Sequence, residues 1–402
     1  MEFVLNALTL GYRPLWSAER QLAGVQLFLQ HDGTQQTDTA HLLRILREMW
    51  GPHAPRLLLS PQTPALLQDL LAFGSPHPAI AIEVRSQWLA QHALLQAQLV
   101  RAAERGVHLV WRGPLAQRPS GDAARPFASS LLQLSPAEAV VLMQSPTQQA
   151  ALQGQMLEDI HSQSLARRAL SEHGASAIAG WPAEDVLHRL RGAHVLHPSH
   201  AHVQRLLQAV GADQSLDTFE DILSEDPLLA YRFMLYANSA ALNARSPINS
   251  LRRALVMLGY GTLQEWLGTQ LVHASHEKDL QPIRLSTVMR AQITAHLLDA
   301  GVSQELRSEV YLCGLFSRLD EVLDEPLATS LTRLPLSDRI AEAAVCGAGP
   351  YAPSLQLAQA MEREDGDATL RALCEEHEMP LEHINRTLLR LVCTWPSAHA
   401  QW

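Results

Sequence analysis

Five histidines crowd a short stretch near the middle of the chain. They are His188, His194, His197, His200 and His202. Neutral imidazoles at short spacing can ligate zinc or nickel. Against a metal site, no Cys and no well-placed Asp or Glu joins them in the sequence, and Pro198 interrupts helical spacing. The pattern of 188–202 therefore favours a solvated linker, with a metal site as the alternative.

Two other short motifs contain residue types used in ligand recognition. Trp111 and the adjacent Arg112 have the chemistry to stack on a nucleobase, although burial of such a tryptophan is the commoner outcome. The run Glu375-Glu376-His377-Glu378 has metal-binding residue types but no second histidine at helical distance. We interpret that run as a solvated helix face.

The charge of the chain argues against broad contact with nucleic acid or membranes. The formal net charge is −10, whereas phosphate backbones need clustered Lys and Arg. Lys278 is the only lysine of the 402 residues, and no uninterrupted apolar run is long enough to span a bilayer. The four cysteines lie far apart with no CxxC pair, which predicts free thiols in a reducing cytoplasm.

The first part of the chain, residues 1–185, alternates short apolar runs with helical patterns. The runs expected as buried strands are 25–30, 56–60, 79–84, 108–111, 130–135 and 139–144. Helical spacing of apolar residues separates several of them, most clearly over 86–106, where Ser86 begins the pattern and Gly106 ends it. This alternation predicts a parallel sheet or a β/α barrel.

The second part, residues 186–402, has helical patterns only. Asp226-Pro227 predicts a helix start, since an Asp N-cap accepts backbone N–H bonds and proline is well tolerated at the first helical position. Asn249-Ser250 opens a further helix that Gly259 is expected to close. We therefore expect an α/β domain over 1–185 followed by an all-α domain over 186–402.

Residues 219–267 carry a motif that resembles the HDOD domain, a bacterial signalling module related to the HD phosphohydrolases. The resemblance rests on Asp226-Pro227, Leu235, Ala237-Asn238-Ser239-Ala240, Ile248, Ala254 and Leu258-Gly259. This version is similar to HDOD domains that follow an EAL domain. The stretches 12–30 and 156–181 resemble the beginning and end of an EAL domain, which implies a shortened EAL-type β/α barrel in the first half.

EAL domains hydrolyse cyclic di-GMP with divalent metals held by carboxylates, so the resemblance indicates where such residues should lie. The signature Glu is replaced by Gln26, and the next strand, 56–60, has no Asn. Glu83 and Glu158 match family carboxylates. Instead of the paired aspartates the chain has 107–115 with Arg112; Gln133 replaces the catalytic Lys, and Gln155 stands where another Glu is expected. Two carboxylates are too few for the expected metal pair.

The helical half also lacks the expected catalytic residues. The HD superfamily binds metal through an adjacent His-Asp, and the single such pair here is His31-Asp32, in the other half, where a surface turn is favoured. For Asn238 and Ser239 we expect hydrogen bonds to backbone at a helix end.

These observations predict a non-catalytic bacterial signalling protein that contacts other signalling proteins and needs no cofactor. One alternative is a receptor that binds cyclic di-GMP without cleaving it, because Arg can hold phosphate bidentately. Another is an active phosphodiesterase with relocated ligands. The sequence indicates no oligomeric state.

Overall fold

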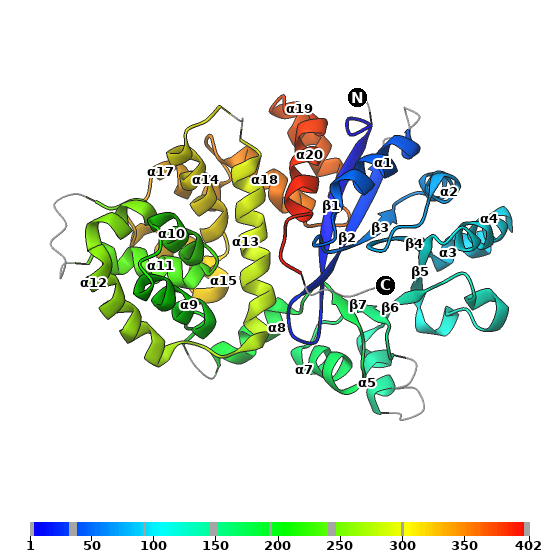
Figure 1. Cartoon of the computed structure of the whole chain (residues 1–402), viewed down its shortest axis with the longest axis horizontal. Helices are drawn as coiled ribbons and strands as arrows, with labels where there is room; N and C mark the ends of the chain where they lie inside the picture. Colours follow the sequence, from blue (N-terminus) through cyan, green and yellow to red (C-terminus); the bar gives the residue numbers. More distant parts are fainter. Residues whose placement is uncertain are drawn as a thin grey trace. The chain divides into compact units, whose positions relative to one another are not determined.

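The first half of the chain forms a closed barrel of eight strands, β1 to β8 in sequence order (Figure 1). The computed structural model describes residues 4–31, 38–91, 93–144, 152–192, 195–239, 247–298 and 301–397. The strands are β1 (Leu8–Trp16), β2 (Leu22–His31), β3 (Arg56–Pro61), β4 (Ile80–Arg85), β5 (His108–Pro114), β6 (Ser129–Gln133), β7 (Met156–Glu158) and β8 (Ala177–Ala179). Strand β1 is antiparallel to both neighbours, and β2 to β8 are parallel.

Helices connect the parallel strands. They are α1 (Thr39–Met49), α2 (Pro64–Phe73), α3 (Ser86–Gln91), α4 (Ala93–Glu104), α5 (Pro136–Gln144) and α7 (Gln163–Arg167), with short turns η1 (Leu115–Gln117), η2 (Gly121–Ala124) and η3 (Arg168–Glu172). The expected helix over 86–106 is present as α3 and α4, and Gly106 has a φ of 84° just beyond its end. The α/β prediction for this half is confirmed.

One expected strand is a helix. Residues 139–144 belong to α5, whose start has the reciprocal bonds of a capping box: Ser135 N donates to Glu138 Oε2 at 3.0 Å, and Glu138 N donates to Ser135 Oγ at 3.3 Å. The prediction followed the apolar run Ala-Val-Val-Leu-Met and overlooked this cap and Pro136 at the first helical position. Strand β1 was not expected, because Gly11 and Pro14 interrupt its apolar pattern.

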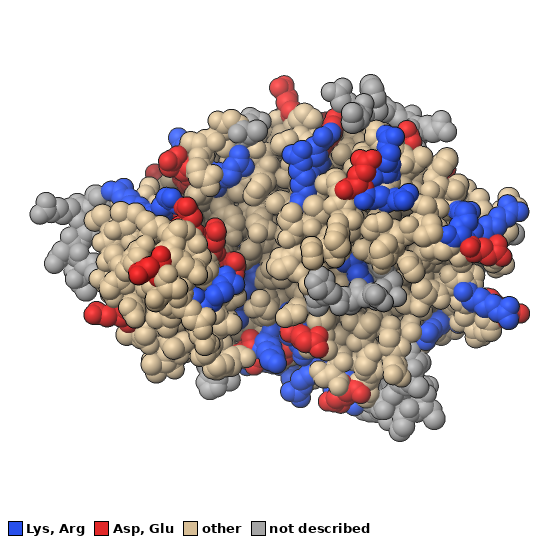
Figure 2. Space-filling model, in the orientation of Figure 1, with Lys and Arg blue, Asp and Glu red and all other residues tan. Residues whose placement is uncertain are grey.

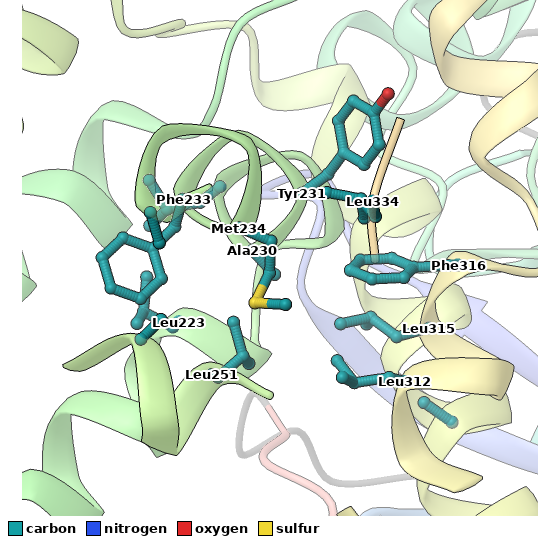
Figure 3. Close-up of a cluster of buried hydrophobic side chains, with 14 of the residues drawn as sticks. Leu223, Ala230, Tyr231, Phe233, Met234, Leu251, Leu312, Leu315, Phe316 and Leu334 are labelled. Atoms are coloured by element: carbon teal, nitrogen blue, oxygen red, sulfur yellow. The ribbon is translucent and has the colours of Figure 1, made fainter. Parts of the chain in front are cut away.

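The second half is helical, as expected. Its helices are α8 (Ala183–Arg191), α9 (His200–Gly211), α10 (Leu216–Ser224), α11 (Pro227–Ala237), α12 (Leu251–His273), α13 (Gln281–His296), α14 (Gln304–Phe316), α15 (Leu319–Leu323), α16 (Leu327–Thr332), α17 (Asp338–Cys346), α18 (Ala352–Met361), α19 (Asp367–Glu376) and α20 (Leu381–Val392), with the short turn η5 (Lys278–Leu280). Figure 3 shows part of the core, in which Phe233 and Met234 of α11 lie close to Leu223 and Leu251.

The chain divides into two compact units that differ from the expected division at the C-terminus. Residues 1–182 together with 359–402 form the barrel unit, and residues 183–358 form the helical unit. The first boundary lies close to the expected residue 185. The last segment differs because α19 and α20 pack against β1, where Figure 1 shows α20 beside that strand.

Candidate functional site

The barrel interior has an apolar layer with a polar layer above it. The apolar layer takes residues from every strand: Leu15, Ala23, Leu58, Ala81, Val110, Leu131, Met156, Ala177 and Ala179. Side chains in a strand alternate between faces, so the residue two positions further along points to the same side. Two residues beyond the apolar layer, towards the C-terminal ends of the parallel strands, stand Ser60, Glu83, Arg112, Gln133 and Glu158. Active sites of β/α barrels lie at this end.

Arg112 joins the two carboxylates of this layer. Its Nη1 donates to Glu83 Oε1 at 3.0 Å, while Nε and Nη2 donate to the two oxygens of Glu158 at 2.7 and 2.8 Å. Glu83 and Glu158 are fully buried, and Arg112 is 6% exposed. A guanidinium therefore lies between the two carboxylates that the sequence predicted as counterparts of EAL metal ligands.

Every N–H group of the Arg112 guanidinium has a carboxylate acceptor. Besides its three bonds to Glu83 and Glu158, Nη1 and Nη2 donate to the two oxygens of Glu364 at 2.7 and 2.9 Å. These bonds account for all five guanidinium donors. Burial lowers the pKa of Arg112, but Glu83, Glu364 and Glu158 together raise it above its ordinary value. Arg112 is a permanent cation in this site.

Gln26 and Ser60 complete the environment of Glu83. Gln26 Nε2 donates to Glu83 Oε2 at 2.6 Å, and Ser60 Oγ donates to Glu83 Oε1 at 2.9 Å. Arg13 of β1 contacts both sides of the layer, since its Nε donates to Gln26 Oε1 at 2.9 Å and its Nη2 to Glu158 Oε2 at 2.9 Å. The carboxylate oxygens are thus occupied by protein donors.

The two remaining glutamines of the expected site lie in different places. Gln133, at the end of β6, lines a polar hollow of about 230 Å³ with Arg85, Ser86, Gln87, Arg112 and Glu364. Gln155 does not reach this cluster. Its Oε1 accepts from Ser130 N at 2.8 Å and its Nε2 donates to Gln153 O, because it precedes β7 and lies at the opposite end of that strand from Glu158.

Glu364 comes from the segment between α18 and α19, and the sequence did not indicate it. Besides Arg112, its carboxylate accepts from Arg85 Nη2 at 2.7 Å and lies 3.5 Å from Arg13 Nη2. Burial raises the pKa of Glu364, but Arg112, Arg13 and Arg85 lower it more strongly, to about 2. Arg13, Arg85 and Glu364 were all missed, although Arg85 at the end of β4 was detectable by its position one residue after the expected strand 79–84.

The barrel site does not fit a divalent metal pair. A guanidinium lies between Glu83 and Glu158, where a hard cation would need their oxygens, and like charges repel. Across the residues that the structure describes, no group of three or more His, Cys, Asp and Glu side chains is placed to hold a metal ion.

Three of the five histidines of 188–202 contact different neighbours. His200 stacks on His276 with ring centroids 4.1 Å apart, and His197 stacks on His273 at 5.8 Å and bonds Arg232 Nη1. His202 lies 3.5 Å from Glu225. His194 lies outside the described residues, as does Asp32 of the His31-Asp32 pair.

Asp226 of the expected HDOD motif makes four polar contacts. It caps α11 by accepting from Leu228 N and Leu229 N at 3.0 and 3.1 Å, with Pro227 at the first helical position. Its other oxygen accepts from Ser199 N at 2.7 Å and lies 3.3 Å from Arg284 Nε. The carboxylate is fully buried, so these four contacts replace its hydration. The expected N-cap is present.

Asn238 and Gly259 have the structural roles expected from the sequence. Asn238 ends α11, where its Nδ2 donates to Met234 O and Ile248 O and its Oδ1 accepts from Ile248 N, all at 2.9 Å. Gly259 has a φ of 70° and separates two helical segments of α12. Ser239 differs from expectation, because its buried Oγ has no hydrogen-bond partner among the described residues. Leu258 packs partly buried against the helical core.

The remaining short motifs have the structures that the sequence favoured. Trp111 is buried, and Glu375, Glu376 and Glu378 are exposed at the end of α19. Over the described ranges of the chain, no helix combines the length and apolarity needed to cross a membrane.

Comparison with known protein families matches residues 196–324 to the HDOD domain. The chain contains an HDOD domain. The matched range includes Asp226, Asn238 and Gly259, and it lies within the helical unit. The order expected from the sequence, a β/α barrel followed by a helical HDOD region, is thus confirmed.

The relatives of the chain are distant. A protein of Vibrio cholerae named cyclic di-GMP phosphodiesterase CdgJ is 25% identical over 170 residues, which are 42% of this chain. That match spans only 39% of the relative's length. The MmoQ response regulator of Methylococcus capsulatus is 16% identical, with a TM-score of 0.37 over 49% of this chain and 99% of that one. The EAL-like domain protein YdiV is 14% identical, with a TM-score of 0.32 over 44% and 93%.

Proposed function

We propose that the barrel does not hydrolyse cyclic di-GMP and that the protein is a non-catalytic signalling protein. The observation that carries this proposal is Arg112, whose guanidinium binds Glu83 and Glu158 at 2.7 to 3.0 Å. Metal-assisted phosphodiester hydrolysis requires carboxylate oxygens free to bind hard cations and a metal-activated water. Here the same oxygens are bonded to an arginine that stays charged at every physiological pH.

The charge of the site supports the same conclusion. A divalent metal bound next to Arg112 would have to overcome repulsion from that cation and from Arg13 and Arg85 in a buried setting, where Coulomb interactions are strong. Gln26 and Gln133 are neutral where the resemblance expects a Glu and a Lys. Among the described residues of the site, no other set of three or more His, Cys, Asp and Glu side chains is placed to hold a metal ion.

A receptor that binds cyclic di-GMP without hydrolysis is the second candidate, and the polar hollow favours it. Arg85, Arg112 and Gln133 line that hollow and could contact phosphate and base edges. Its volume of about 230 Å³ is below the 300–1,000 Å³ of typical small-molecule sites. The Glu364 carboxylate also accepts hydrogen bonds from Arg85 and Arg112, the groups that a phosphate would need. We therefore rank the receptor below the protein-binding function.

Contacts with other proteins are supported by the surface of the HDOD region. Val256, Met257, Tyr260 and Val272 of α12 are 61, 59, 40 and 78% exposed. Large contiguous apolar patches mark protein-binding surfaces, and Val256, Met257 and Tyr260, which lie close together in the sequence, are where we propose such a contact. In Figure 2, by contrast, basic and acidic side chains are interspersed among the described residues of the face shown, which argues against a nucleic-acid surface there.

A hydrolysis assay tests the proposal. Purified full-length protein is incubated with cyclic di-GMP and Mg²⁺ or Mn²⁺, beside an active EAL phosphodiesterase as positive control, and the linear product is quantified. We expect no product above the buffer background. Turnover that disappears in Glu83→Gln but persists in the surface variant Glu375→Gln would overturn the proposal and indicate an active enzyme.

Calorimetric titration with cyclic di-GMP separates the first two candidates. The non-catalytic protein-binding function predicts no saturable heat at micromolar nucleotide. Saturable binding without turnover, lost in Arg85→Gln, would support the receptor instead.

A further inference from the structure

The segment 361–367, which we call the strap, packs against β1 of the barrel. A Cβ atom on Gly11 of β1 would lie 3.0 Å from Met361 O and 3.1 Å from Arg363 O, so the strap's backbone lies directly on this glycine. Downstream, Asp367 accepts hydrogen bonds from Thr9 and from Gln30 Nε2. These contacts on either side of Glu364 hold its side chain over the polar layer.

The Glu364 carboxylate occupies its site in the manner of a bound anion. Both oxygens accept from Arg112 in a bidentate pair, Oε1 also accepts from Arg85, and Oε2 lies near Arg13. Bidentate contacts from a guanidinium are the geometry by which proteins recognise carboxylates and phosphates. Arg85 Nε has no hydrogen-bond partner among the described residues, although it lies 3.5 Å from Glu83 Oε1.

The charges of the cluster balance only when Glu364 is present. Three cations, Arg13, Arg85 and Arg112, face three anions, Glu83, Glu158 and Glu364. Without Glu364 the cluster carries one excess positive charge in a largely buried setting. An uncompensated buried charge is costly, so the vacated position would favour an incoming anion.

We propose that the three arginines form a binding site for phosphate-type oxyanions and that Glu364 is its tethered internal ligand. The strap then acts as an autoinhibitory element, since a phosphate group must displace the Glu364 carboxylate to reach Arg85 and Arg112. This proposal goes beyond the proposed function, because it holds whether or not the protein contacts partners through its HDOD region.

Tethering sets the concentration at which a free anion can compete. A group attached by a short segment has an effective concentration of about millimolar or more at its own site. Free phosphate well below this concentration is therefore excluded from the intact protein. Removing the Glu364 charge while keeping the side-chain shape should open the site to it.

The test uses full-length Glu364→Gln with inorganic phosphate as the probe. Thermal unfolding is followed by circular dichroism while sodium phosphate replaces sodium chloride at constant ionic strength. A ligand that binds only the folded state raises Tm with its concentration. We expect the Tm of Glu364→Gln to rise with phosphate concentration. Its apparent affinity for phosphate should be at least about tenfold tighter than that of the unchanged protein, because the competing Glu364 carboxylate is gone.

Two controls make the result specific. Asp365→Asn removes the same charge from the neighbouring exposed ion pair with Arg363 and should respond to phosphate like the unchanged protein. Arg85→Gln combined with Glu364→Gln restores charge balance and should lose the phosphate response. If Glu364→Gln does not fold in chloride, phosphate should restore its fold. A folded Glu364→Gln with the same phosphate response as the unchanged protein, or an unfolded one that phosphate does not rescue, would overturn the proposal.

Discussion

Arg112 joins Glu83 and Glu158 in one salt-bridge cluster inside the barrel. The side chains of Glu83 and Glu158 point into the same layer of the barrel, where two buried carboxylates repel each other unless a cation or a proton compensates them. The guanidinium of Arg112 supplies that charge and donates three of its five N–H groups to the oxygens of Glu83 and Glu158. Both acidic side chains thus belong to a buried ion-pair cluster.

Removing Arg112 should destabilise the barrel strongly. Arg112→Met keeps much of the side-chain length but leaves Glu83 and Glu158 buried with less compensation, which typically costs about 3–5 kcal/mol. Urea unfolding of the full-length variant measures this loss. Arg125→Met, in an ion pair with Asp122 whose side chains are 81 and 86% exposed, should change stability by less than about 0.5 kcal/mol. Equal effects of both variants would show that the cluster contributes little.

Glu364 should make the stability of the barrel depend on pH in the acid range. Its pKa is about 2 in the folded protein and about 4.5 in an unfolded chain, so protons bind preferentially to the unfolded state. The stabilisation is complete above pH 4.5 and is lost as the pH falls towards 2. The shift corresponds to about 3 kcal/mol. The unfolding free energy of the unchanged protein minus that of Glu364→Gln should shrink over this window. A difference that is constant from pH 6 to pH 3 would contradict the ion-pair assignment.

At the scale of elements, β1 depends on the C-terminal helices. Among the described residues it pairs with β8 only at Leu15 and Trp16, so the rest of that edge has no strand partner there. Asn385 of α20 fills part of the gap: Oδ1 accepts from Leu10 N at 3.2 Å, and Nδ2 donates to Leu5 O and Leu8 O at 2.7 Å. A buried strand edge must have such partners, because unpaired backbone groups are costly away from water.

Replacing Asn385 should therefore unpair backbone groups of β1. Asn385→Ala removes three hydrogen bonds at a residue that is 1% exposed, and we expect a loss of about 2–5 kcal/mol in unfolding free energy. Arg390→Ala, on an exposed position of the same helix, serves as the control and should stay within about 0.5 kcal/mol. A similarly small effect at Asn385 would show that α20 is dispensable for this edge.

Gly259 divides α12, and its conformation predicts opposite outcomes for two glycines of the same helix. Gly259→Ala has open space for the methyl group but a φ of 70°, so backbone strain alone should cost about 1–3 kcal/mol. Gly268→Ala, also in open space and without a positive φ, should stabilise by up to about 1 kcal/mol through helix propensity. Thermal unfolding of the two variants compares them directly, and two shifts of the same sign would contradict the assigned kink.

At the scale of the whole molecule, the chain leaves the barrel and returns to it. Residues 183–358 form the helical unit with its own core, and residues 359–402 belong to the barrel unit. The apolar side chains of α20 are buried there: Ile384, Leu388, Leu389 and Val392 are at most 1% exposed. The HDOD region is thus an insertion between two parts of one barrel unit.

This arrangement predicts different behaviour for two fragments. A fragment of residues 183–358 should be soluble and unfold cooperatively, because its buried core is complete. A fragment of residues 1–182 should aggregate or lack cooperative unfolding, because it loses α19, α20 and the hydrogen bonds of Asn385 to β1. Adding residues 359–402 by co-expression should restore its solubility. A cooperative, monomeric 1–182 fragment would contradict the assignment of the last segment to the barrel.

The sequence determined those features that have a local pattern. Short apolar runs indicated β2 to β6, Asp226-Pro227 indicated the start of α11, and the HDOD motif indicated the helical half. Gln26 and Arg112 were visible as departures from the EAL pattern. Where two local signals compete, as at the apolar run and capping box of α5, the sequence alone was misleading.

The tertiary structure decided how these residues combine. Glu364 is 252 positions from Arg112 in the chain, and neither residue's neighbours carry a sign of the other. Likewise, the apolar stripe of α20 predicts that this helix packs against something, but not that its partner is β1. Contacts of this kind depend on which surfaces fold together, and side-chain periodicity records only which face of an element is buried. The salt-bridge cluster of the barrel site could therefore be recognised only from the tertiary structure, in which residues 359–402 belong to the barrel unit.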